Sequence, residues 1–298
     1  MCSANLISNA AFKLCIIMEM KPTVAFQGEK GAYSEAAAFE YFGEHIDVIP
    51  CEQFEDVFAK INNGVATHAI LPIENSQAGS IHRNYDLILR NDLYISGEYN
   101  FRVRHCLLAL PGVHIENILS VHSHPQALAQ CENRLARLGV KRVAETDTAG
   151  SARLIVERGD QKAAAIASLR AAQVYGLEVL EEGIEDNTEN FTRFIALTSQ
   201  PFSRDDMLEG EYKTSVVFSL INQPGVLFKA LSVFALRDID LTKIESRPDP
   251  GKTWEYLFYI DFAGHAEEQK CALALNHLQE LAPFMRVLGS YPRHNLSG

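Results

Sequence analysis

Residues 23–42 have the sequence TVAFQGEKGAYSEAAAFEYF. Residues 23–27 show the short apolar pattern of a strand, residues 28–31 predict a turn, and residues 32–42 place Ala, Phe and Tyr on one helical face. The same unit recurs along the following chain. We expect further strands at 47–49, 68–73, 103–110, 118–122, 142–145, 163–167 and 193–197, and helices at 54–61, 80–89, 125–138, 148–157 and 168–175. This alternation predicts α/β sheets with helices on both faces and ligands at the strand ends.

A different pattern begins after residues 199–211, whose sequence SQPFSRDDMLEGE is typical of a linker. Beyond it we expect a strand at 214–221, a helix at 224–236, strands at 241–246 and 255–262, a helix at 267–281 and a strand at 285–288. This β-α-β-β-α-β order predicts a ferredoxin-like domain. Such a module has an open sheet face or edge, which favours pairing with a second copy.

The chain therefore divides into a first α/β domain at residues 22–198, a linker at 199–212 and a second domain at 213–293. We expect the leader, residues 1–21, to be peripheral. Residues 1–19 carry Lys13 as their only base, so they match neither a secretory signal nor a transit peptide, and Met20 is a candidate internal start.

The composition excludes several classes of protein. Of 298 residues 47% are hydrophobic, and 38 acidic against 27 basic residues give a net charge of −11, which disfavours nucleic-acid binding. We find no apolar run long enough for a transmembrane helix and therefore expect no membrane partner. None of the six cysteines forms a C-x-x-C pair, so we expect no metal site and a reducing compartment. The cytoplasm fits, or the plastid stroma in a photosynthetic eukaryote.

Two polar clusters follow predicted strands in the middle of the first domain. Glu74 and Asn75 come after the strand at 68–73, and a plain helix capped by Ser80 is an equally good interpretation of that segment. Gln126 and Gln130 are four residues apart in the predicted helix that follows Ser123, so they share one face. That face suits a polar ligand, although capping and solvated glutamines explain it equally well.

Two further clusters lie later in this domain. Asp147 and Thr148 precede a predicted helix, where they form an anion cradle or an ordinary N-cap. Residues 187–194, NTENFTRF, contain Thr192 and Arg193. The guanidinium of Arg193 offers a planar fork for a carboxylate, or it pairs with nearby acids on the surface.

Motifs of other enzyme classes are missing from the sequence. It contains no G-x-S-x-G, H-E-x-x-H, Walker loop or G-x-G-x-x-G. The four clusters instead supply neutral donors, helix N-termini and one arginine. They predict a site that holds a multiply charged small acid without a cofactor.

The chain as a whole resembles the prephenate dehydratase family, which includes arogenate dehydratases of plants and some bacteria. The resemblance runs from Thr23 to Pro292. Its markers are VAFQGEKGAYSEAA from Val24, LPIENSQAGSIHRNYDLIL from Leu71, SHPQALAQC from Ser123, DTAGSA from Asp147, AAIAS from Ala164 and NFTRF from Asn190. The C-terminal unit, with QPGVLFKAL from Gln223 and ESRP from Glu245, resembles an ACT domain.

The resemblance implies a two-lobed catalytic domain like periplasmic binding proteins, and a carbon–oxygen lyase that needs no cofactor. Prephenate would lose its ring carboxylate as carbon dioxide and its 4-hydroxyl as water, giving phenylpyruvate. The implied catalytic residues are Thr192, Asn75, Ser123 and Gln130. The implied substrate-binding residues are Arg193, Glu74, Asp147 and Thr148. A hydroxyl is a weak acid, so we interpret Thr192 as a hydrogen-bond donor to the leaving oxygen.

The resemblance also implies regulation by L-phenylalanine and a homodimer or homotetramer built from paired ACT domains. The implied effector residues are Asn222, Gly225, Val226, Leu227, Glu245 and Ser246. A purely structural dimerisation module is the alternative. The bulk of Val226, where many bacterial members have Ala, predicts weaker sensitivity.

Prephenate is the substrate we favour from the sequence, and arogenate is the alternative. The sequence segments VLFKAL, HCLLALPGV and LTKIESRP resemble those of plant arogenate dehydratases, which favours arogenate without deciding the question. A non-catalytic amino-acid sensor or solute-binding protein is a third possibility, from a different class.

Overall fold

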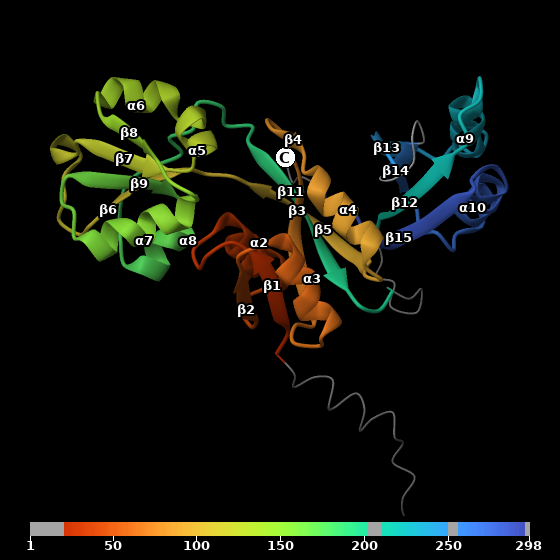
Figure 1. The fold of residues 1–298 in the computed structure, drawn as a ribbon, viewed down its shortest axis with the longest axis horizontal. Helices are drawn as coiled ribbons and strands as arrows, with labels where there is room; N and C mark the ends of the chain where they lie inside the picture. The colour runs from red at the N-terminus through yellow and green to blue at the C-terminus, as the bar shows by residue number, and fades with distance from the viewer. Residues whose placement is uncertain (1–20, 202–209, 250–255, 296–298) are drawn as a thin grey trace, which may run out of the picture.

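The computed structural model describes residues 21–201, 210–249 and 256–295. The expected leader, with Met20, and most of the expected linker lie outside these ranges. The described chain forms two α/β lobes and a C-terminal α/β domain (Figure 1). The two lobes confirm the predicted fold class.

The first lobe contains a mixed sheet in the order β2-β1-β3-β11-β5, with β4 paired to β3. Its strands are β1 (Thr23–Gln27), β2 (Asp47–Cys51), β3 (His68–Asn75), β4 (Gly79–Ser80), β5 (Tyr94–Arg102) and β11 (Phe191–Thr198), and its helices are α2 (Tyr33–Phe42), α3 (Phe54–Asn62) and α4 (His82–Arg90). Strand β11 returns from the far side of the second lobe and inserts between β3 and β5, antiparallel to both. The second lobe is therefore an insertion into the sheet of the first.

The second lobe contains a sheet in the order β10-β6-β9-β7-β8. Its elements are β6 (Cys106–Ala109), a short 3₁₀ helix (Ile115–Asn117), β7 (Ser120–Ser123), α5 (Pro125–Gln130), α6 (Glu132–Leu138), β8 (Lys141–Ala144), α7 (Thr148–Arg158), β9 (Ala163–Ala167), α8 (Leu169–Tyr175) and β10 (Glu178–Glu182). Every residue of β9 is buried, as expected for a central strand whose two faces are both covered. This lobe lies on the left in Figure 1.

The C-terminal domain has the predicted β-α-β-β-α-β order. Its elements are β12 (Tyr212–Leu220), α9 (Val226–Ala235), β13 (Leu241–Pro248), β14 (Tyr256–Ala263), α10 (Gln269–Leu281) and β15 (Phe284–Pro292), with the sheet order β13-β14-β12-β15. Along β12, Val216 and Phe218 pack with α9 and α10, whereas Val217 joins the core of the first lobe. Both sheet faces are therefore covered along β12, and the expected open feature lies at the edge strand β13, where every second residue is exposed.

Several local expectations need correction. Strands β5 and β10 were not expected, and the expected helix at 125–138 is interrupted at Cys131. The expected strand at 103–110 is reduced to β6, and α9 begins at Val226 rather than at 224. Ser80 is not an N-cap, because it pairs with β3 and the N-cap of α4 is Ile81. A Cβ at position 97 of β5 would lie 1.7 Å from the hydroxyl of Tyr41, so glycine is required there. Because glycine has no apolar side chain, it weakens the sequence pattern of this strand.

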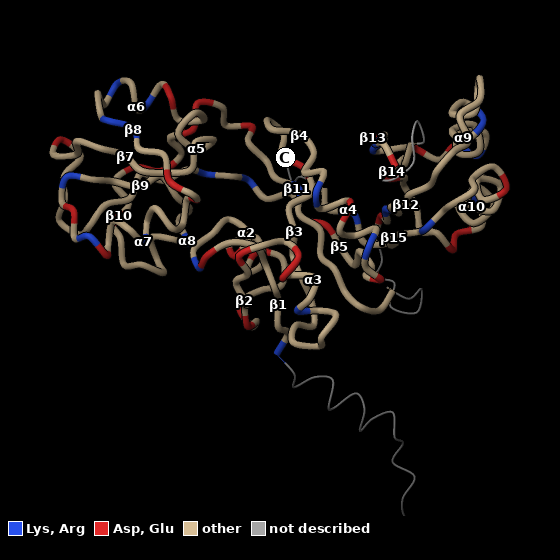
Figure 2. The backbone as a smooth tube through the Cα atoms, viewed as in Figure 1, with Lys and Arg blue, Asp and Glu red and all other residues tan. Residues whose placement is uncertain are grey.

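Charged residues of both signs are interspersed along the described chain (Figure 2). None of the helices in the described ranges combines the length and apolar character needed to span a membrane.

The C-terminal domain docks onto the first lobe through a close backbone contact. A Cβ on Gly289 of β15 would lie 2.1 Å from the carbonyl oxygen of Ile95 of β5. Gly289→Ala should therefore lower the stability of the protein by about 3 kcal/mol, the upper end for overpacking, and reduce the urea midpoint. Gly112→Ala is the control, since its Cβ would meet nothing and costs only about 1 kcal/mol of left-handed strain. Equal effects of the two substitutions would contradict close docking.

Candidate active site

Strands β3 and β11 separate two sets of polar residues by the alternation of side chains along a strand. In their antiparallel register, Thr192 lies opposite Asn75, and Arg193 lies opposite Glu74. Side chains of neighbouring residues in a strand point to opposite faces of the sheet. Asn75 and Thr192 therefore face one way, and Glu74 and Arg193 face the other.

The face of Asn75 and Thr192 borders a cleft with a volume of about 510 Å³. The first lobe contributes residues such as Tyr33, and the second lobe contributes Gln126 and Asp147. The full lining is Gln27, Tyr33, Ser34, Phe54, Pro72, Asn75, Ala78, Ile81, Val103, His105, His124, Gln126, Ala127, Gln130, Asp147, Thr148, Asn190, Thr192 and Phe194. Apolar walls with a few convergent polar groups are typical of a small-molecule site.

The amide of Asn75 organises one side of this cleft. Its Nδ2 lies 3.0 Å from Oδ1 of Asn190 and 3.0 Å from Oγ1 of Thr192. Its Oδ1 accepts the backbone N–H groups of Gln77 and Ala78 at 3.0 and 2.9 Å. Because Asn75 donates to the oxygen of Thr192, the hydroxyl hydrogen of Thr192 is free to donate into the cleft.

A second set of hydrogen bonds reaches the cleft from the buried side. Oε1 of Gln130 lies 2.8 Å from Nε2 of His105 and 3.3 Å from Nδ2 of Asn190. Nδ1 of His105 lies 2.7 Å from the hydroxyl of Tyr33. Burial lowers the pKa of His105, against the opposing effects of Gln130 and the Glu185 carboxylate, so the ring is neutral at pH 7.

Most of the predicted site residues meet at this cleft. Asn75, Gln130, Thr192, Asp147 and Thr148 all line it. Asp147 is also the N-cap of α7, because its Oδ1 accepts the N–H of Gly150 at 2.6 Å. Asp147 can therefore cap α7 and line the cleft at the same time, so the two interpretations of this segment are compatible. Gln126 lines the cleft together with Gln130, as their spacing predicts.

Three predicted site residues lie elsewhere. The hydroxyl of Ser123 is buried and donates to the carbonyl of Ile166 at 2.7 Å. Glu74 accepts a hydrogen bond from Nζ of Lys243 at 2.7 Å, and Arg193 faces the C-terminal domain. None of these three residues lines the cleft. Their positions therefore do not support the direct contacts with substrate that we expect from the sequence.

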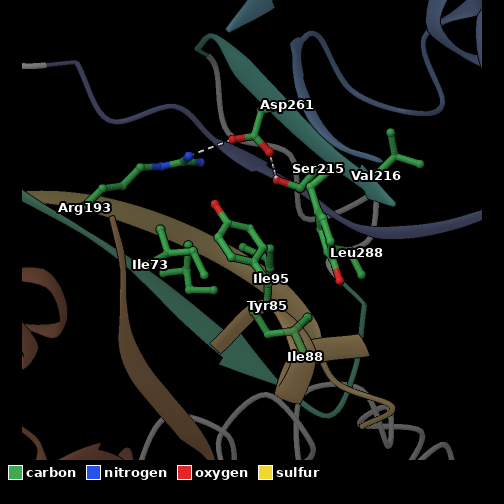
Figure 3. Close-up of a pocket in the computed structure, with 11 residues that line it drawn as sticks. Ile73, Tyr85, Ile88, Ile95, Arg193, Ser215, Val216, Asp261 and Leu288 are labelled. Atoms are coloured by element: carbon green, nitrogen blue, oxygen red, sulfur yellow. Dashed lines mark hydrogen bonds and ion pairs between the residues drawn. The ribbon is translucent and has the colours of Figure 1, made fainter. Parts of the chain in front are cut away.

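Arg193 instead belongs to a buried ionic network between the first lobe and the C-terminal domain (Figure 3). Its Nε donates to Glu98 at 2.8 Å, and its Nη1 donates to Asp261 at 2.7 Å. Lys213 donates to both oxygens of Glu98, at 2.7 and 2.8 Å. Tyr291 lies 3.1 Å from Nη2 of Arg193. Two cations therefore balance two carboxylates at the domain boundary.

This network shifts the pKa of its members. Burial opposes the charge of Asp261, but Arg193, the hydroxyl of Ser215 and Lys213 together hold the pKa of Asp261 below its usual value. Burial and the charge of Arg193 lower the pKa of Lys213, against the effect of Glu98. Breaking one member would leave its partners buried without compensation.

Sequence reasoning missed Tyr33 and His105. Tyr33 lies inside the recognised VAFQGEKGAYSEAA stretch but has no motif of its own. His105 precedes a buried apolar strand, β6, and nothing in the sequence around it distinguishes it from a structural histidine. The two side chains are recognised only in the folded protein, where α2, α5 and residues 103–105 come together at the cleft.

Comparison with known proteins assigns the chain to a family. A family model described as prephenate dehydratase matches residues 24–201, and an ACT-domain model matches residues 214–270. The chain belongs to the prephenate dehydratase family. It is therefore a dehydratase with lyase-type chemistry, as the resemblance implies.

Two curated plant relatives of this dehydratase are close to half identical. One is "Arogenate dehydratase 2" of Petunia hybrida, 51% identical over 90% of this chain and 71% of the relative. Another is the chloroplastic "Arogenate dehydratase/prephenate dehydratase 2" of Arabidopsis thaliana, 50% identical over 90% of this chain and 72% of the relative.

Two solved structures share the whole architecture. A prephenate dehydratase from Arthrobacter aurescens, in complex with L-Phe, has a TM-score of 0.82 at 35% identity and covers 91% of this chain and 90% of its own. A protein described as a quorum-quenching acylase has a TM-score of 0.85 at 36% identity and covers 91% of this chain and 98% of its own.

The predicted effector residues of the dehydratase are divided by the fold. Asn222 and Gly225 are exposed next to the start of α9. Glu245 faces the catalytic domain, where it accepts from the hydroxyl of Ser80 at 2.6 Å and lies 2.9 Å from Nδ1 of His82. Ser246 is exposed on the other face of β13. Glu245 is thus a contact between the two domains of the chain.

Arg193→Met should destabilise the dehydratase by about 3 kcal/mol without a specific increase in KM, because it leaves Glu98 and Asp261 buried with less positive charge. Urea denaturation and steady-state kinetics measure the two effects. Arg83→Met is the control, since the exposed pair of Arg83 with Glu55 contributes less than about 1 kcal/mol. A higher KM with unchanged stability would contradict this prediction and indicate that Arg193 binds the substrate.

Proposed function

We propose that this dehydratase acts on arogenate, converting it to phenylalanine, carbon dioxide and water. The observation that carries the proposal is the cleft of neutral donors in a chain 51% identical to an enzyme named arogenate dehydratase. From the sequence we favoured prephenate, with arogenate as the alternative. The names of the plant relatives favour that alternative.

The reaction needs two bonds to break together. The bond from the ring to its carboxylate breaks and its electron pair enters the ring, while the C–O bond to the 4-hydroxyl breaks and the leaving oxygen takes a proton from solvent to become water. Thr192 donates a hydrogen bond to that oxygen, and the bond strengthens as negative charge develops there. Aromatisation supplies the driving force. Asn75 supports the step by donating to the oxygen of Thr192 at 3.0 Å.

The charge of the cleft also suits arogenate. Among the described lining residues, Asp147 is the only aspartate, glutamate, lysine or arginine. Arogenate carries an ammonium group that prephenate lacks, so its net charge is less negative. A less anionic substrate meets less repulsion from the Asp147 carboxylate.

Purified protein should show a kcat/KM at least tenfold higher with arogenate than with prephenate, which corresponds to about 1.4 kcal/mol. Amino-acid analysis detects phenylalanine, and ultraviolet absorbance in alkali detects phenylpyruvate. Thr192→Ala should reduce kcat about 10²-fold for both substrates, as for loss of one preorganised donor, whereas Thr192→Ser should keep most activity.

Asp147→Asn sharpens this comparison because asparagine is an equally good N-cap and removes only the charge. The variant should lower the ratio of kcat/KM for arogenate to kcat/KM for prephenate, because the negative charge that repels prephenate more strongly is gone. A wild-type preference for prephenate would overturn the choice of substrate. Turnover of neither substrate would instead favour the amino-acid sensor that the sequence also allows.

We further propose that L-phenylalanine binds the ACT domain between paired copies of the chain, near Asn222, Gly225, Val226, Leu227 and Ser246. Glu245, which the resemblance also implies, instead contacts the first lobe of its own chain. The Arthrobacter relative in complex with L-Phe supports the ligand. Exposed apolar side chains support the pairing, since Phe228 is 77% exposed and Ile244 is 50% exposed at the edge strand β13. The chloroplastic Arabidopsis relative favours the plastid among the compartments considered.

Phenylalanine should lower the activity and bind with measurable heat, because it stabilises a less active state. Calorimetry and light scattering, each with and without the amino acid, measure binding and oligomer size. Phe228→Asp is the test of pairing and should increase the fraction of monomer, with Lys229→Asp as the neighbouring exposed control. A monomer without heat of binding at millimolar phenylalanine would contradict this regulation.

A further inference from the structure

A chain of hydrogen bonds along the cleft joins Asn75, Asn190, Gln130, His105 and Tyr33. The donor and the acceptor of each bond can be deduced from the orientation of the Asn75 amide. Oδ1 of Asn75 accepts two backbone N–H groups, those of Gln77 and Ala78, so this atom must be the oxygen of the amide. Nδ2 of Asn75 is then the donor to Asn190 and Thr192. A backbone turn thus sets the direction of the first hydrogen bonds.

The same direction continues to the second lobe. Asn190 is fully buried, and its Oδ1 accepts from Asn75, so its Nδ2 is the donor that lies 3.3 Å from Gln130. The Gln130 atom that receives this bond must be Oε1. Oε1 also lies 2.8 Å from Nε2 of His105, and an amide oxygen accepts only, so Nε2 of His105 carries a proton.

The other ring nitrogen of His105 is then an acceptor. Burial lowers the pKa of His105, which leaves one proton on the neutral ring, and Nε2 holds it. Burial also raises the pKa of Tyr33, so its hydroxyl keeps its proton. Of the two acceptors near this hydroxyl, Nδ1 of His105 at 2.7 Å is closer than the carbonyl oxygen of Arg104 at 3.3 Å. The one carboxylate that acts on His105 is that of Glu185, which accepts the backbone N–H of His105 at 2.9 Å.

We propose that His105 is a positioning residue for the dehydratase reaction, which holds Gln130 with its amide nitrogen directed into the cleft. With Oε1 bound to His105 and Asn190, the free donor of Gln130 is its NH₂ group. No described residue accepts a hydrogen bond from that group, and Gln130 lines the cleft. This nitrogen is therefore available to donate to an anionic or oxygen-bearing part of the substrate. No proton passes along the network, because its amides hold their hydrogens.

The inference rests on the proposed function for its kinetic test. His105→Leu should lower kcat/KM about tenfold with the better of arogenate and prephenate, because Gln130 can then rotate and present its oxygen. His105→Gln should recover most of the loss, since its side-chain nitrogen can replace Nε2 as the donor to Gln130. Unchanged thermal melting of both variants serves as the folding control.

A double-mutant cycle separates positioning from a general structural role. In a Gln130→Ala background, His105→Leu should have little further effect on kcat/KM, because the group that it positions is absent. Additive losses would overturn the proposal, as would equal losses in His105→Gln and His105→Leu.

A spectroscopic test is independent of any substrate. Nitrogen-15 chemical shifts of His105 in the intact protein should show protonated Nε2 and unprotonated Nδ1 at pH 7. Protonated Nδ1 with bare Nε2 would overturn the proposal even if the protein were fully active. If neither substrate turned over but the tautomer were as expected, the proposed function would fail and the orientation of Gln130 would stand.

Discussion

The positive charge of Arg193 lies buried between the first lobe and the C-terminal domain, and the arrangement of both depends on its neutralisation. Glu98 of β5 and Asp261 of β14 approach it from opposite domains, and Lys213 of β12 completes the balance. Charges of this kind are tolerated in an interior only when the set is complete. The C-terminal domain therefore supplies part of the environment that the catalytic domain needs.

One strand connects this boundary with the cleft. Thr192 and Arg193 are neighbours in β11, and they face opposite sides of the sheet. A shift of the C-terminal domain that moves Asp261 acts on Arg193, and the backbone of Arg193 is joined directly to that of Thr192. The residue that contacts the C-terminal domain and the residue that lines the cleft are thus joined by one peptide bond.

The sequence was informative where local chemistry decides the outcome. Most strands and helices were expected near their observed places because apolar periodicity reflects burial, and Asp147 caps its helix as its type predicts. Strand β5 was missed because packing against Tyr41 requires Gly97, which breaks the pattern. Both Thr192 and Arg193 were assigned to substrate, although alternation within a strand should have separated them. One partner of Arg193 is Asp261, 68 residues later in the chain, and no local pattern predicts a contact across such a separation.

The insertion of β11 between β3 and β5 has a consequence for synthesis of the chain. The ribosome releases β3 and β5 before the entire second lobe, so the sheet of the first lobe lacks a central strand while that lobe is made. Its core is completed later still, when Val217, Tyr259 and Leu288 arrive from the C-terminal domain. Non-local pairing of this kind is slow, and unpaired strands are prone to aggregate. The nascent chain therefore exposes unpaired strands of the first lobe until β11 has been made, and part of the core of that lobe until β15 has been made.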